Sequence, residues 1–311
     1  MNDEYFRPRW RGQPGRLETW YTTITDPATG TGVWLHHELV APADGSPALA
    51  HGWAALFPPD GPPALTRFGP APWQAADDCY AAGDVRITPT RLCGQAGEAR
   101  WDLAQDGGGD PLFTFPRWAW RRSVLPAAHL VPVPGARFSG TVTVDGTTLT
   151  LRDAPGATGR IYGHGHARRW AWLHADLGDG DVCEVVAAVS NRPGMRRLRP
   201  LPFVRLRIGG ADWPTGDPLL NAFRMRARIG LPEWTVTGRS GDRRLRVEVT
   251  QPPERTVAVS YADPDGTPAV CRNTERATAT VTIARRRRGT WTPEHRWHLD
   301  GTAHAEVGSH A

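Results

Sequence analysis

Apolar and polar residues alternate with a period of two through most of the chain, and turn dipeptides interrupt the pattern. Successive side chains of a β-strand point to opposite faces, so this pattern predicts half-buried strands. Residues 17–41 read as one hairpin and residues 169–190 as another. In FSGTVTVDGTTLTLR the dipeptide Asp145-Gly146 is typical of a type I′ turn. We therefore expect an all-β protein.

The 29 prolines and 34 glycines leave little room for long helices between these strands. Only residues 217–229 could hold a short helix, and the second half of that segment reads equally as a strand. Roughly ten strand candidates lie on each side of the breaker-rich residues 153–159, which is enough for one barrel in each half. We predict two lipocalin-like antiparallel β-barrels in tandem, over residues 1–157 and 158–311.

The chain carries a formal net charge of +5, and all 37 of its basic residues are arginine. Together with abundant alanine, glycine and proline, the absence of lysine indicates a GC-rich codon bias rather than a phosphate-binding surface. The tight run Arg285 to Arg288 ends a predicted strand, where charges hinder pairing with strands of other molecules. We expect no nucleic-acid partner.

No apolar run approaches the ~20 residues of a membrane span, and the first ten residues lack the apolar region of a signal peptide. We therefore expect a cytoplasmic protein without a transmembrane segment. Its four cysteines form no CxxC pair, so zinc-type spacing is absent and we expect reduced, buried thiols. The sequence leaves the oligomeric state open.

The segment YGHGHARRWAWLHAD, residues 162–176, holds the densest set of reactive side chains. If it formed one straight strand, one face would carry Tyr162, His164, His166, Arg168, Trp170, Trp172, His174 and Asp176. The opposite face would be mostly small and apolar. Indoles supply flat apolar walls, and imidazoles titrate near neutrality. This combination predicts a pocket for an apolar ligand with a reacting polar centre.

Other interpretations of this segment stay open. Aromatic strands are often plain core, and a bulge at the glycines that flank His164 would break the alternation. The pair His164 and His166 is typical of cupin-type metal sites, but Arg168 and Arg169 stand where a carboxylate would follow. We therefore expect no metal. The nucleophile motif GxSxG and the glycine-rich nucleotide motifs are absent, so we expect no cofactor.

Two further strands carry polar side chains of one parity: Trp34, His36 and Glu38 in the N-terminal half, and Cys271, Asn273 and Glu275 in the C-terminal half. These groups could converge on the same space as residues 162–176. A carboxyl group against indole walls would have a raised pKa and could donate a proton at neutral pH. Glu248 and Glu306 are further carboxylates of this kind, although most strand carboxylates face water.

Three stretches carry a family likeness. GRIYGHGHARRWAWLHADL leads from Tyr-x-x-x-His into a Trp-rich strand, YADPDGTPAVCRNTERA joins an Asp-Gly turn to Asn-Thr-Glu, and DGTAHAEVG contains Ala-x-x-Glu-x-Gly. They resemble the tocopherol cyclase and carotenoid 1,2-hydratase family, whose relatives include lipocalin-like Diels-Alderases. In one place the chain departs from the family, because Ala-Arg-Arg follows His166 where Asn-Trp-Gly is usual.

The resemblance implies two lipocalin-like barrels with a ligand cavity and cofactor-free chemistry on polyenes or prenyl chains. Protonation of an alkene, followed by capture of the cation by water or a hydroxyl, gives hydration or ring closure. Indole faces stabilise such a cation by up to ~2 kcal/mol each. A shaped pocket could instead fold a polyene for a pericyclic step through positioning alone.

We therefore expect a cofactor-independent cyclase, hydratase or isomerase that acts on a lipophilic terpenoid-like or polyene molecule. His164 and His166 would handle the proton, with Asp176 or Glu275 as the orienting or donating acid. The predicted ligand contacts are Trp34, His36, Tyr162, Trp170, Trp172, His174 and Asn273. The alternative is a non-catalytic binder or carrier of a lipophilic molecule, in which the histidines only hydrogen bond a polar head group.

Overall fold

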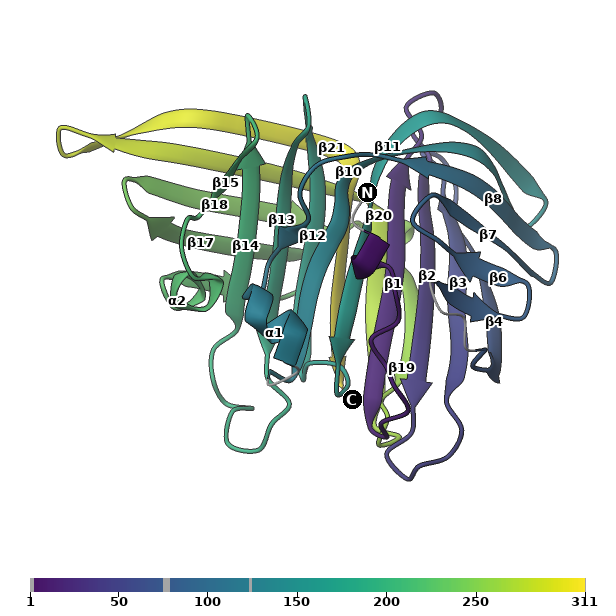
Figure 1. Ribbon diagram of the computed structural model, residues 1–311. Coiled ribbons are helices and arrows are strands. Elements are labelled where there is room, and N and C mark those ends of the chain that lie inside the picture. Colours follow the sequence, from purple (N-terminus) through teal and green to yellow (C-terminus); the bar gives the residue numbers. More distant parts are fainter. Residues whose placement is uncertain (1–2, 75–78, 123–124, 311) are drawn as a thin grey trace. The chain divides into compact units, whose positions relative to one another are not determined.

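The computed structural model describes residues 3–74, 79–122 and 125–310, and most of these lie in antiparallel strands (Figure 1). The expected all-β class with two lipocalin-like barrels is confirmed. The chain forms two compact units. The first consists of Met1–Phe113, Ala119–Gly165 and Ala262–Pro268, and the second of Thr114–Trp118, His166–Tyr261 and Ala269–Ala311. The division at residues 157 and 158 stays a prediction.

The first unit holds an 11-stranded sheet in the order β4-β3-β2-β1-β11-β10-β8-β7-β6-β5, with β9 paired to β10. Its strands are β1 Arg16–Thr25, β2 Gly32–Ala41, β3 Leu49–Phe57, β4 Ala64–Pro72, β5 Tyr80–Ala82, β6 Val85–Ile87, β7 Arg91–Ala96, β8 Ala99–Asp106, β9 Leu112–Phe113, β10 Ala127–Val144 and β11 Thr147–Gly163. A short 3-10 helix, Asp3–Tyr5, precedes them, and helix α1, Arg117–Arg122, lies between β9 and β10.

The second unit holds a 10-stranded sheet in the order β15-β14-β13-β12-β21-β20-β18-β17-β16, with β19 paired to β20. Its strands are β12 Arg169–Gly178, β13 Asp181–Val189, β14 Leu201–Ile208, β15 Ala211–Trp213, β16 Met225–Arg228, β17 Glu233–Ser240, β18 Arg243–Thr250, β19 Val257–Ala262, β20 Pro268–Arg287 and β21 Thr290–His310. Helix α2, Pro218–Phe223, precedes β16, and a 3-10 helix, Pro253–Arg255, precedes β19.

The predicted hairpins are confirmed, and their turn residues explain them. Asp145 and Gly146, which join β10 to β11, have φ angles of 50° and 70°. Two successive positive φ angles define the type I′ turn, whose twist matches that of the flanking strands. Asp179 and Gly180 join β12 to β13 in the same way, with φ angles of 55° and 81°. Hairpins at residues 17–41 and 169–190 are thus β1–β2 and β12–β13.

Residues 217–229 form a short helix and then a strand, as their sequence predicts. The Asp217 side chain accepts hydrogen bonds from the backbone N–H groups of Leu219 and Leu220 at 2.8 and 3.2 Å, which caps α2. Pro218 occupies the first helical turn, where its missing N–H costs nothing. Helix α1 was not predicted. Residues 153–159, which suggested a barrel boundary, lie inside β11.

Each sheet buries its aliphatic residues on one face. In the first unit Val33, Leu35 and Leu39 of β2 belong to the apolar core. In the second unit Ala171 and Leu173 of β12 do so. The alternate residues of both strands therefore point to the opposite face of their own sheet, and most of these residues are aromatic, basic or acidic. The two opposite faces carry the candidate sites.

A buried ion pair fixes the N-terminal segment of the first unit. Glu18 on β1 and Arg160 on β11 are both fully buried and in direct contact. The Glu18 carboxylate also accepts hydrogen bonds from the backbone N–H groups of Arg9 and Trp10, and Arg160 lies 4.0 Å from the centroid of the Trp20 ring.

Within the described residues, no helix is long and apolar enough to span a membrane.

Candidate active site

One face of the second sheet carries a cluster of acidic, basic and aromatic side chains. On β12 the residues Trp170, Trp172 and His174 are buried and point away from the core face. The strand register sets their neighbours, because His174 lies opposite Glu184 on β13 and opposite His304 on β21. We call this set the β12 cluster, and it comprises Trp170, Trp172, His174, Glu184, Cys271, Asn273, Glu275, His304 and Glu306.

Two histidine–glutamate pairs lie side by side in the β12 cluster. His174 Nδ1 is 2.8 Å from Glu184 Oε2, and His304 Nδ1 is 2.6 Å from Glu275 Oε2. The two imidazoles stack with their centroids 6.0 Å apart. All four residues are buried. His174 Nδ1 and Glu184 Oε2 form a hydrogen bond, and an Nδ1–H that donates to a carboxylate leaves Nε2 as a proton acceptor, so Glu184 orients His174 as a base.

Glu306 lies against the Trp170 indole and the Cys271 thiol in the cluster. The indole Nε1 of Trp170 donates to Glu306 Oε1 at 2.7 Å. Glu306 is half-buried as a residue, yet burial of its carboxyl raises its pKa above the ordinary value and outweighs the hydrogen bonds from Trp170 and Cys271. Burial likewise raises the pKa of the Cys271 thiol, with the nearby Glu306 charge as the second cause. Glu306 thus holds its proton more tightly than an ordinary glutamate does.

Two polar groups of the cluster have no hydrogen-bond partner among the described residues. Both polar atoms of the Asn273 amide are unpaired, although this residue is fully buried. The Nε2 atom of His174 is unpaired as well. An unsatisfied buried polar group costs about 1–3 kcal/mol, so such groups are uncommon in the absence of a ligand. Both groups are therefore available to bind a ligand.

Close packing positions the aromatic wall of the cluster. Trp170 lies opposite Gly308 on β21, and its indole lies in the space that a Cβ at Gly308 would occupy. His166 stacks on the other side, with ring centroids 5.2 Å from Trp170 and 4.5 Å from Tyr261. A glycine at position 308 is thus required for this placement of Trp170.

Residues 162–176 do not form the straight strand that the alternation suggested. β11 ends at Gly163 and β12 begins at Arg169, so the residues between them break the parity. The only signal for this break in the sequence is local, and it consists of the two glycines that flank His164. Tyr162 and His164 belong to the first unit, whereas His166 to Asp176 belong to the second.

Tyr162, His164 and Asp176, all predicted site residues, lie outside the β12 cluster. Tyr162 is buried against other apolar residues of the first unit, with the Arg9 guanidinium 4.7 Å from its ring centroid. His164 is exposed, and its Nδ1 lies 3.0 Å from Arg16 Nη1. The Asp176 side chain accepts a hydrogen bond from the backbone N–H of Gly178 at 2.9 Å, next to the β12–β13 turn.

Trp34 and His36 belong to a second polar cluster, which lies on the first sheet. His36 Nε2 and His51 Nε2 lie 3.5 and 3.6 Å from Glu38 Oε2. The Trp34 and Trp53 rings stack at 6.2 Å. We call these five buried residues of β2 and β3 the β2 cluster. Among the described residues, no group of three or more His, Cys, Asp or Glu side chains has the arrangement of a metal site.

The family model of tocopherol cyclase-like proteins matches residues 119–309, which include the whole β12 cluster. This chain belongs to the tocopherol cyclase-like family. Two uncharacterised proteins of Mycobacterium tuberculosis, from strains CDC 1551 / Oshkosh and ATCC 25618 / H37Rv, are 49% identical to it over 303 residues. These matches cover 97% of this chain and 88% of each relative.

Two solved structures share the fold at low sequence identity. The crystal structure of CghA with Sch210972 has a TM-score of 0.61 and 13% identity, covering 95% of this chain and 88% of that one. Kievitone hydratase from Nectria haematococca has a TM-score of 0.54 and 12% identity, covering 99% and 91%. At such identities the likeness establishes the fold alone, and it agrees with the tocopherol cyclase-like assignment.

Two of the tocopherol cyclase-like sequence elements meet in the β12 cluster. Asn273 and Glu275 come from the Asn-Thr-Glu element on β20, and Glu306 with Gly308 comes from the Ala-x-x-Glu-x-Gly element on β21. The register places Asn273 on one side of Glu306 and Trp172 on the other. Residues far apart in the sequence thus become neighbours on three adjacent strands.

Sequence reasoning missed Glu184 and His304, and it named Glu306 only as a further carboxylate outside the expected site. A local signal existed for each of them. Glu184 is the single charged residue within the apolar run VCEVVAAV, and His304 shares its parity with Glu306 in AHAEV. A charge on an otherwise apolar strand is costly unless it has a partner. The partners, however, come from other strands, and no local pattern identifies them.

Proposed function

We propose that this protein is a cofactor-independent cyclase, hydratase or isomerase that acts on a lipophilic terpenoid-like or polyene molecule by proton transfer. The tocopherol cyclase-like family and the shared fold of a hydratase support a catalytic role of this type. The observation that carries the proposal is the Glu306 carboxyl, whose pKa is raised by burial and which lies beside the unpaired Asn273 amide.

Glu306 is the proposed proton donor. A neutral carboxyl transfers its proton to one carbon of an alkene, so that the O–H bond breaks, a C–H bond forms and a carbocation is left on the neighbouring carbon. The indole faces of Trp170 and Trp172 stabilise a cation electrostatically. The protein also holds the acid and the alkene in contact, and this positioning makes the protonation faster than it is in solution.

His174 is the proposed base. Its Nδ1 faces Glu184 at 2.8 Å, which leaves the unpaired Nε2 to accept a proton from the attacking hydroxyl. Attack by a hydroxyl of the substrate forms a ring, and attack by water forms an alcohol. Direct loss of a proton from a carbon next to the cation gives an isomer instead. In each case the base takes one proton and Glu306 supplies one, so the net proton count of the protein is unchanged. Transfer of a proton from the His174 imidazolium to the Glu306 carboxylate, through exchange with solvent water, then restores the starting state.

Asn273 is the proposed binding group for the polar end of the substrate. A primary amide donates and accepts hydrogen bonds, and it suits a phenol, a quinol or an enol equally. His166 and Tyr261 extend the aromatic wall beyond Trp170. The roles first predicted for His164 and Asp176 thus pass to His174 and Glu306, and Glu275 becomes the orienting partner of His304.

Incubation in D₂O with a panel of prenylated hydroquinones, prenylated phenols and linear polyenols tests this proposal. The wild type should give a product with one carbon-bound deuterium, detected by mass spectrometry. Glu306→Gln should bind the same compounds, measured by quenching of tryptophan fluorescence, and convert them at least 100-fold more slowly. Glu248→Gln, which changes an exposed carboxylate of the same unit, should convert them at the wild-type rate.

Two outcomes would count against the proposal. Conversion by Glu306→Gln at the wild-type rate would remove this carboxyl from the mechanism. Tight binding of the panel without conversion by any form would favour a carrier of lipophilic molecules, which the same cluster could serve through the Asn273 amide alone.

A further inference from the structure

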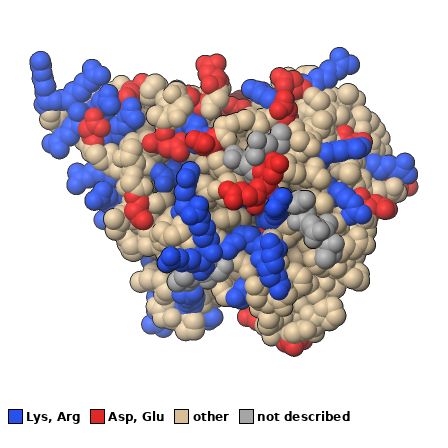
Figure 2. All heavy atoms as spheres, in the orientation of Figure 1, with Lys and Arg blue, Asp and Glu red and all other residues tan. Residues whose placement is uncertain are grey.

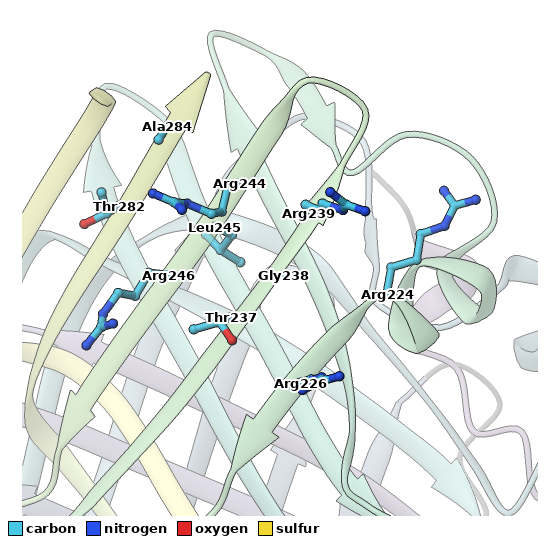
Figure 3. A pocket seen from close by; sticks show the side chains of 10 residues that line it. All are labelled: Arg224, Arg226, Thr237, Gly238, Arg239, Arg244, Leu245, Arg246, Thr282 and Ala284. Atoms are coloured by element: carbon cyan, nitrogen blue, oxygen red, sulfur yellow. The ribbon is translucent and has the colours of Figure 1, made fainter. Parts of the chain in front are cut away.

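A groove of about 560 Å³ on the second unit is lined by five arginines (Figure 3). They come from adjacent segments of one sheet and the helix beside it: Arg224 after α2, Arg226 on β16, Arg239 on β17, and Arg244 and Arg246 on β18. All five side chains are exposed. The groove lies on the outer face of these strands. Val236 and Val247, on the same strands, point to the opposite face and belong to the apolar core.

The positive charge of this groove is only partly compensated. Arg246 pairs with Glu248 at 2.8 Å, and Arg244 lies 5.1 Å from the centroid of the Trp291 ring. In the part of the chain that the structure describes, Arg224, Arg226 and Arg239 have no carboxylate partner.

The strand register adds to the electrostatic cost of the groove. Arg239 lies directly opposite Arg244. Like charges that face each other on neighbouring strands destabilise a sheet. A sheet face arranged in this way is stabilised by an anionic partner, so the groove points to a ligand that carries several negative charges.

Exposed apolar side chains flank the groove. On α2, Leu220 and Phe223 are 63% and 57% exposed. The loop between β13 and β14 is held at the C-terminal end of α2, because the Arg199 guanidinium donates to the backbone oxygens of Phe223 and Met225 at 2.8 and 2.9 Å. That loop exposes Leu198 by 53%. In Figure 2, arginines lie beside uncharged surface at the lower left, where Figure 1 draws this loop.

We propose that this surface docks the protein on the anionic headgroups of a lipid bilayer. We call it the basic–apolar surface, and it comprises Arg224, Arg226, Arg239, Leu198, Leu220 and Phe223. Guanidinium groups bind lipid phosphates, and large apolar side chains beside them enter the boundary between headgroups and acyl chains. A nucleic acid would match the arginines but not the exposed Leu198 and Leu220 side chains, which have no role in phosphate binding.

The docking proposal goes beyond the proposed function and does not depend on it. If both hold, the protein meets a lipophilic substrate at the membrane in which that substrate dissolves. A protein that docks without catalysing any reaction, or that catalyses without docking, would separate the two.

Flotation of the full chain with vesicles of phosphatidylcholine containing about 30% phosphatidylglycerol tests the docking. Arg226→Gln with Arg239→Gln should weaken partitioning by about 30-fold, because each arginine near an anionic surface contributes about fivefold. Leu220→Ser with Phe223→Ser should weaken it at least tenfold. The matched control is Arg286→Gln with Arg287→Gln, which removes the same charge from exposed positions at the β20–β21 turn and should partition like the wild type.

Three results would overturn the docking proposal. The first is equal partitioning of the wild type into pure phosphatidylcholine vesicles. The second is an equal loss in the charge-matched control, which would reduce the effect to net charge. The third is that the wild type binds a DNA or RNA oligonucleotide but not vesicles, and that the variant with Leu220→Ser and Phe223→Ser still binds the oligonucleotide. Circular dichroism of each variant checks that these exposed substitutions leave the fold intact.

Discussion

Asn273 lies directly opposite Glu306 in the antiparallel register of β20 and β21. One of these residues offers an amide with no partner among the described residues, and the other offers a carboxyl whose pKa is raised by burial. A polar group held by the amide would bring the adjoining part of a ligand to the acid. This relationship links ligand binding to proton transfer.

The Asn273 amide should lower the stability of the folded protein while it serves to bind the ligand. Asn273→Leu removes an unsatisfied buried amide, so the free energy of unfolding should rise by about 1 kcal/mol while ligand binding and turnover fall. Asn221→Leu is the matched control, because that buried amide donates to the Thr215 carbonyl at 2.9 Å and accepts from Ser240 Oγ at 3.2 Å. It should lose about 1–3 kcal/mol. Urea unfolding measures both, and a loss of stability in Asn273→Leu would contradict the assignment.

The raised pKa of Glu306 predicts the sign of a pH dependence. Because the folded state holds this proton more tightly than the unfolded chain, the stabilisation is complete below the ordinary glutamate pKa and is lost as the pH rises through the folded-state pKa. Glu306→Gln does not titrate. The unfolding free energy of the wild type, relative to Glu306→Gln, should therefore fall as the pH rises from the ordinary glutamate pKa through the folded-state pKa. A difference that grows with pH would show an ionised Glu306 instead.

Gly308 should be required for the position of Trp170 rather than for the fold at large. In Gly308→Ala the added methyl overlaps the indole, so Trp170 must move and its hydrogen bond to Glu306 must lengthen. We expect a shift of the tryptophan emission spectrum and at least tenfold slower turnover of any substrate. Gly135→Ala, at a strand glycine with open space around its Cβ position, should show neither change.

His37 should make the first unit sensitive to acid. Its ring lies in the apolar core, 5.3 Å from the Tyr80 ring and 5.4 Å from the Phe68 ring, and burial lowers its pKa to about 3. The unfolded chain binds this proton at higher pH, so stability should fall by up to about 1.4 kcal/mol per pH unit between about pH 6 and about pH 3. His37→Phe should flatten this slope in urea unfolding, whereas the exposed His298→Phe should keep it.

The fold could be predicted from local signals because strand alternation and turn chemistry are local properties. Asp145-Gly146 specifies its turn through two positive φ angles, and Asp217 specifies the start of α2 through its side-chain cap. The shared face of Trp170, Trp172 and His174 follows from parity within one uninterrupted strand. Where β11 and β12 separate, parity no longer applies, and the expected grouping of His164 with His174 is wrong in geometry.

The candidate site could be predicted only in part, because its other half depends on strand pairing over long sequence distances. Glu184 reaches His174 across the β12–β13 hairpin, but His304 and Glu306 reach β12 from the far end of the chain. The register that joins them is set by the packing of the whole sheet. The sequence element Ala-x-x-Glu-x-Gly contained Glu306 and Gly308, yet only the paired strands reveal that Gly308 makes room for the indole that binds Glu306.

The pH at which the Glu306 carboxyl loses its proton is the most direct test of its proposed role as the acid. Infrared difference spectroscopy between the wild type and Glu306→Gln isolates the carbonyl stretch of this one carboxyl group. If Glu306 is the acid, the band of its protonated carboxyl should persist in the wild type to a higher pH than that of an ordinary glutamate before the carboxylate band replaces it. Loss of the protonated band at or below the pH of an ordinary glutamate would contradict this role.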